Sequence, residues 1–80
     1  ELRRHHQVRL AAMLASMDDG SMTAYEVASK VPWDIGPWKD FSPHDRRSAM
    51  NETLAHLEFL RRNGDAGLEE SDGTDVYRPA

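Results

Sequence analysis

The sequence predicts a mainly α-helical fold with a small β-hairpin wing, that is, a winged helix-turn-helix of three helices plus a wing. One amphipathic stretch and two capped helix starts supply the helices, and two strand-like runs around a glycine turn supply the wing. The chain has 80 residues, of which 39% are hydrophobic and 30% are charged. This length allows one small domain over residues 1–80.

The first helix is expected over residues 2–17. At about 100° per residue, one stripe collects the apolar side chains and one histidine, namely Leu2, His6, Leu10, Met13, Leu14 and Met17. The next three residues, Asp18, Asp19 and Gly20, have the turn chemistry that ends such a helix.

The second helix is expected to begin at Thr23 and to run for about nine residues, short enough to need packing for its stability. Thr23 and Glu26 have the spacing of a capping box, in which each side chain accepts the backbone N–H of the other residue. Pro32 ends the helix, because proline disfavours the helical conformation of the residue before it.

The third helix has the clearest start. Ser42 suits the N-cap, Pro43 suits the first helical position, and Asp45 lies near the positive helix end. Asn63 and Gly64 end it. Its predicted apolar face consists of Ala49, Met50, Thr53, Leu54, Leu57 and Leu60.

The C-terminal part of the chain is predicted to form the wing. Residues 66–70 and 74–78 are expected to be two short strands around the turn residues 71–73. The step formed by Ser21 and Met22 could supply a short third strand beside them.

The loop over residues 32–42 carries large apolar side chains, whereas a mobile linker would be polar. Trp33 and Trp38 have two open interpretations: they complete the small core, or one of them faces a partner domain. Phe59 is predicted on the outward face of the third helix, where it favours a protein contact unless the wing folds over it. We therefore expect Trp33, Trp38 and Phe59 to form a domain interface.

The charge distribution disfavours nucleic acid as a partner. The chain has 14 acidic and 10 basic residues, and its formal net charge is −4. Residues 63–80 hold five acidic side chains and one arginine, whereas a wing beside phosphates should be basic. The outward face of the third helix offers Glu52 and Glu58 rather than base-reading side chains. A DNA-binding domain of a transcription regulator remains the alternative function.

No pattern indicates an active site within these residues. The histidines lack metal-binding spacing, the chain has no cysteine, and neither a Gly-x-Ser-x-Gly elbow nor a phosphate-binding glycine loop is present. We expect no catalytic residue, metal ligand or cofactor in this chain. His6 is expected to pack on the apolar stripe of the first helix and His56 to lie at the edge of the stripe of the third.

Several segments together resemble a known family. Residues 49–64 are similar to the "ET-x-AHL-x-x-L-x-x-x-G" stretch of the winged-helix domain that follows the catalytic domain in many metallo-β-lactamase-fold hydrolases. Residues 5–10 resemble its opening "His-Arg-x-x-Arg-Leu", with His6 in place of the usual Arg. Residues 22–28 resemble its second helix, and residues 31–38 resemble its aromatic loop.

The resemblance implies a C-terminal accessory domain that belongs to a longer hydrolase. An N-terminal metallo-β-lactamase-fold domain of the same polypeptide would hold the catalytic groups and the zinc, and this chain would form a cap that shapes substrate access. Full-length relatives act on thioesters, other small esters, lactones or RNA. The start at Glu1 rather than Met agrees with a fragment. A homodimer that uses the same aromatic side chains is a further possibility.

No apolar run approaches the ~20 residues of a membrane-spanning helix. We expect a cytoplasmic protein with no membrane partner.

Overall fold

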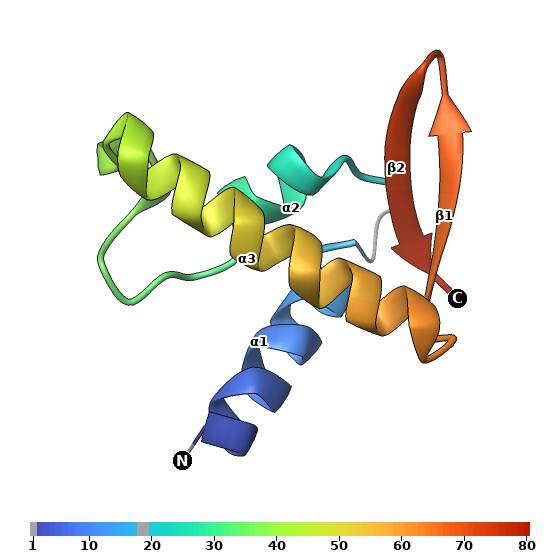
Figure 1. The fold of residues 1–80 in the computed structure, drawn as a ribbon, viewed down its shortest axis with the longest axis horizontal. Coiled ribbons are helices and arrows are strands. Elements are labelled where there is room, and N and C mark those ends of the chain that lie inside the picture. The colour runs from blue at the N-terminus through green and yellow to red at the C-terminus, as the bar shows by residue number, and fades with distance from the viewer. Residues whose placement is uncertain (1, 18–19) are drawn as a thin grey trace.

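The computed structural model describes residues 2–17 and 20–80, with side chains from Arg4 onward. Within this part, three α-helices and a 3₁₀ turn precede an antiparallel hairpin (Figure 1). The predicted fold class is thereby confirmed. Asp18 and Asp19, which were expected to end the first helix, lie outside the described residues. The elements are α1 (Leu2–Ser16), α2 (Ala24–Lys30), η1 (Trp38–Asp40), α3 (Pro43–Arg62), β1 (Ala66–Ser71) and β2 (Thr74–Pro79).

Both predicted N-caps of α2 and α3 form as expected. The hydroxyl of Thr23 accepts the N–H of Glu26 at 3.1 Å, and the N–H of Thr23 donates to the Glu26 carboxylate at 2.9 Å. These bonds, first that from the Thr23 backbone, lower the pKa of Glu26. Ser42 accepts the N–H of Asp45 at 3.1 Å. These contacts are local in sequence, so they set where α2 and α3 begin before any tertiary packing.

The core lies where the three helices meet the base of the hairpin. Helix α3 runs diagonally across α1 and α2, and the hairpin stands at one side of the bundle (Figure 1). Every main element contributes to the buried cluster, which consists of Met13, Met17, Met22, Val27, Val31, Leu57, Leu60, Ala66 and Tyr77.

The wing pairs in register from Ala66 opposite Pro79 to Ser71 opposite Thr74. Asp72 (φ 52°) and Gly73 (φ 82°) form the turn between the strands. Both φ values are positive, as in the type I′ turns that suit the twist of a hairpin. Met22 joins β2 through a backbone bridge to Tyr77, with N···O distances of 2.8 and 2.7 Å. The predicted short strand at this step is thus present as a single bridge.

The buried line of α1 differs from the predicted stripe. Arg9, Met13 and Met17 are buried, whereas His6 is exposed and the expectation that it packs on the stripe is wrong. Met13 and Met17 belong to both lines, but Arg9 is buried in place of His6, and its charge is paired with Glu52. The side chain of Leu2, which was assigned to the stripe, lies outside the described part.

The apolar face of α3 is narrower than the sequence suggests. Leu54 was predicted on this face but is 40% exposed. Glu58 was predicted to point outward but turns toward the wing, where its carboxylate accepts a hydrogen bond from Tyr77. The wing does not fold over Phe59, which stays 51% exposed.

Candidate functional site

The aromatic loop folds back onto the helices, one of the two outcomes expected for it. The indole N–H of Trp33 donates to the carbonyl oxygen of Ala28 at 2.8 Å. The guanidinium of Arg9 lies over the face of the Trp33 ring, and its carbon is 4.4 Å from the ring centre, within cation–π range. Trp33 is half-buried and packs against the core.

Trp38 joins the same aromatic cluster through Phe41. Its ring centre lies 5.1 Å from that of Phe41 and 5.5 Å from that of Tyr25, which it meets edge-on. Phe41 in turn lies 6.3 Å from Trp33. Arg46 covers Trp38, with its guanidinium carbon 5.3 Å from the ring centre. Edge-on and tilted aromatic pairs at these distances are attractive, so these contacts hold the loop together and against α2 and α3.

Arg9 connects this cluster to α3. Its side chain is only 9% exposed, and Nη1 lies 2.6 Å from Oε2 of Glu52. The pair joins residues 43 positions apart in the sequence. The buried charge therefore has both a carboxylate partner and an aromatic face.

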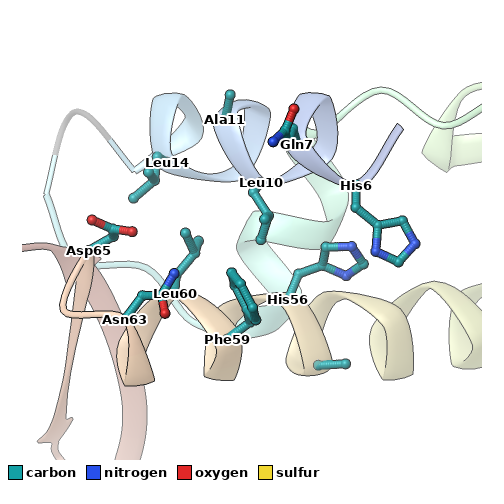
Figure 2. Close-up of a pocket in the computed structure, with 11 residues that line it drawn as sticks. His6, Gln7, Leu10, Ala11, Leu14, His56, Phe59, Leu60, Asn63 and Asp65 are labelled. Carbon is teal, nitrogen blue, oxygen red and sulfur yellow. The ribbon is translucent and has the colours of Figure 1, made fainter. Parts of the chain in front are cut away.

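A separate apolar groove of about 680 Å³ lies between α1 and α3. Figure 2 shows Leu10 and Leu14 pointing down from α1, with Phe59 and Leu60 rising from α3. The small side chains of Ala11 and Ala55 line the same space. The other lining residues are His6, Gln7, His56, Asn63 and Asp65.

Two imidazole rings stand at one end of this groove (Figure 2). The ring centres of His6 and His56 are 5.3 Å apart. Nδ1 of His56 lies 2.7 Å from the carbonyl oxygen of Glu52, and because a carbonyl only accepts, Nδ1 is the donor. Over the described residues, no three His, Cys, Asp or Glu side chains converge closely enough to hold a metal ion.

Glu58 of α3 is the charged residue that connects this helix to the wing. Its carboxylate accepts hydrogen bonds from Arg61 at 2.7 Å and from the Tyr77 hydroxyl at 2.8 Å. These contacts, Arg61 first, lower the pKa of Glu58 to about 2. Burial, and then the bond to Glu58, raise the pKa of Tyr77 to about 12. This network fixes the hairpin to α3 and leaves Phe59, the next residue, on the groove side.

The three side chains predicted to form an interface thus lie in two separate places. Trp33 and Trp38 share one cluster and are engaged within the chain, while Phe59 lies in the groove. Sequence reasoning placed Phe59 outward but missed the facing wall from α1. The repeat of Leu10 and Leu14 at i, i+4, on the same ridge as His6, was the signal that could have found it.

The described part of the chain contains no helix both long and apolar enough to cross a membrane.

Comparison with known proteins shows a similarity to a solved structure. No family model matches the sequence, and no curated protein matches it. Among solved structures, the chain is similar to a β-lactamase domain protein from Burkholderia ambifaria, with a TM-score of 0.82 and 28% sequence identity. The match covers 99% of this chain but only 22% of that one. The chain therefore spans about a fifth of the length of the protein that it resembles.

Proposed function

We propose that this chain is the non-catalytic C-terminal accessory domain of a metallo-β-lactamase-fold hydrolase, in which it caps the substrate cleft of the catalytic domain. The observation that carries the proposal is the match of nearly the whole chain to 22% of a β-lactamase domain protein. A similar domain thus occurs as a minor part of a larger β-lactamase domain protein.

The arrangement of side chains supports an accessory role. Two polar contacts, between Arg9 and Glu52 and between Glu58 and Tyr77, each fix one element to another. Neither contact activates a nucleophile: the pKa of the Tyr77 hydroxyl is raised to about 12, and that of the Glu58 carboxyl beside it is lowered to about 2, which makes it a weak base. In this proposal the zinc and the catalytic groups belong to the other domain, and the protein is cytoplasmic.

The wing supports a protein partner over DNA. Glu69, Glu70, Asp72 and Asp75 are all exposed on the hairpin. The arginine of this hairpin, Arg78, lies 3.4 Å from Glu69 and is partly neutralised by it. Phosphates would meet a repulsive surface here.

The test compares three polypeptides: the 80-residue chain, the longer product of its gene, and that product with these residues deleted. Each is assayed against thioesters, small esters, lactones and RNA in the presence of zinc. We expect no turnover by the 80-residue chain, turnover by the long product, and a raised KM or altered substrate preference after the deletion.

Two results would overturn the proposal. One is hydrolysis by the 80-residue chain alone. The other is tight, salt-dependent binding of duplex DNA by that chain at physiological ionic strength, which would favour the transcription-regulator alternative.

A further inference from the structure

We infer that the groove between α1 and α3, centred on Phe59, is the surface on which the catalytic domain of the same polypeptide docks. This inference rests on the proposed function and adds to it the face through which the two domains meet.

The groove is apolar on both walls. Leu10 and Leu14 of α1 face Phe59 and Leu60 of α3 across it (Figure 2). Phe59 is 51% exposed although it lies directly beside the core residue Leu60. A contiguous apolar surface of this kind, with polar groups at its ends, marks an interaction site more often than a solvated face.

The helices and strands that the structure describes do not cover this groove. The hairpin is fixed to a different side of α3, because Tyr77 of β2 bonds both Glu58 and the backbone of Met22. The aromatic loop is held by the Trp33 bond to Ala28 and by the ring cluster around Phe41.

The charges of the groove suit a protein surface. Among the described residues, Asp65 is the sole acidic side chain that lines it, and the imidazoles of His6 and His56 stand at the opposite end from Asn63 (Figure 2). The acidic side chains of the wing lie on the hairpin instead. Docking through the groove would therefore desolvate few charged groups, which is the costly part of burying a surface.

The size of the groove favours a tethered partner over a second copy. Of the residues that the structure describes, eleven line it, whereas a stable interface between free proteins needs about 20–30 residues on each side. A domain in the same polypeptide needs fewer contacts, because the linker keeps its effective concentration high, on the order of millimolar. The similar protein has most of its length outside the matched region, which is where such a domain would lie.

The experiment measures the accessibility of single cysteines, since the chain contains none of its own. Phe59→Cys reports on the groove and Ile35→Cys, 69% exposed, on the aromatic loop. Val8→Cys, 64% exposed on α1 but not part of the groove lining, is the control. Each variant is labelled with a maleimide in the 80-residue chain and in the long gene product, and labelling is read on the peptide that carries the new cysteine.

We expect the labelling rate of Phe59→Cys to fall about tenfold or more in the long product, which corresponds to about 1.4 kcal/mol of docking free energy. The rates of Val8→Cys and Ile35→Cys should change little. All three sites are already exposed, so the helical circular dichroism signal of each variant should match that of the unchanged chain.

Other outcomes overturn the inference in distinguishable ways. Equal labelling of Phe59→Cys in both polypeptides refutes docking at the groove. Protection of Ile35→Cys alone moves the interface to the aromatic loop and leaves the proposed function standing. Protection of Phe59→Cys that rises with the concentration of the 80-residue chain assigns the groove to a second copy. A long product without a β-lactamase-fold domain refutes the proposed function itself.

Discussion

The hydroxyl of Tyr77 in β2 donates a 2.8 Å hydrogen bond to Oε2 of Glu58 in α3. Tyr77 is buried at the base of the wing and also pairs through its backbone with Met22. The other carboxylate oxygen of Glu58 accepts a 2.7 Å bond from Arg61. The carboxylate of Glu58 thus links the hairpin to α3. The wing lies on the side of α3 that carries Glu58, and the groove lies on the side that carries Phe59.

We predict that acid weakens the fold through Glu58. The folded pKa of about 2 lies below the ordinary 4.5, so the ionised group stabilises the folded state above pH 4.5. This contribution should be lost as the pH falls from 4.5 to about 2. Urea unfolding across this range, compared with Glu58→Gln, measures it. A variant that loses as much stability with falling pH as the unchanged chain would contradict this origin.

Alkaline conditions should weaken the fold through Tyr77. Its folded pKa of about 12 exceeds the ordinary 10.0, so the protonated hydroxyl stabilises the fold below pH 10 and that contribution is lost as the pH rises to about 12. Tyr77→Phe should cost about 1 kcal/mol at neutral pH, the usual loss for one hydrogen bond. It should also remove the alkaline decline. Tyr25→Phe is the matched control, because Tyr25 is exposed.

The pair formed by Arg9 and Glu52 gives a third prediction. Glu52→Gln should lower the free energy of unfolding by about 1–2 kcal/mol, because it leaves the buried guanidinium without its carboxylate. Arg9→Met should cost less, since Glu52 is half-exposed and can be hydrated. Glu69→Gln breaks an exposed pair with Arg78 and should change stability by less than about 0.5 kcal/mol.

Chemical denaturation of the three variants under one condition decides between these expectations. Equal losses for Glu52→Gln and Glu69→Gln would show that the burial of Arg9 adds nothing to the strength of its pair.

The elements that sequence predicts well are those fixed by neighbours in the chain. The bonds between Thr23 and Glu26 and between Ser42 and Asp45 span three positions, so residue type and spacing suffice to place them. The Asp72 and Gly73 turn is equally local, since it depends on two residues that tolerate positive φ.

Side-chain placement between elements was less predictable. Helical spacing assigned His6 to the buried stripe, but the structure buries Arg9 instead. The partners of Arg9, Glu52 and Trp33, lie in distant parts of the sequence, so helical spacing could not reveal them. For the same reason, the sequence predicts that Phe59 points outward but does not predict that α1 lies opposite it and forms the second wall of a groove. For Trp33, the bond to Ala28 favours the interpretation that it completes the core.

The last prediction concerns Thr53, a fully buried residue of α3 whose hydroxyl has no hydrogen-bond partner within the described structure. A buried hydroxyl without a partner costs about 1–3 kcal/mol of desolvation. Thr53→Val keeps the branched shape and should raise the free energy of unfolding by about 1 kcal/mol. Thr23→Val, by contrast, removes the N-cap of α2 and should lower it by about 1 kcal/mol. Replacing threonine by valine should thus raise the urea midpoint at position 53 and lower it at position 23. A loss of stability in Thr53→Val would mean that the Thr53 hydroxyl does find a partner.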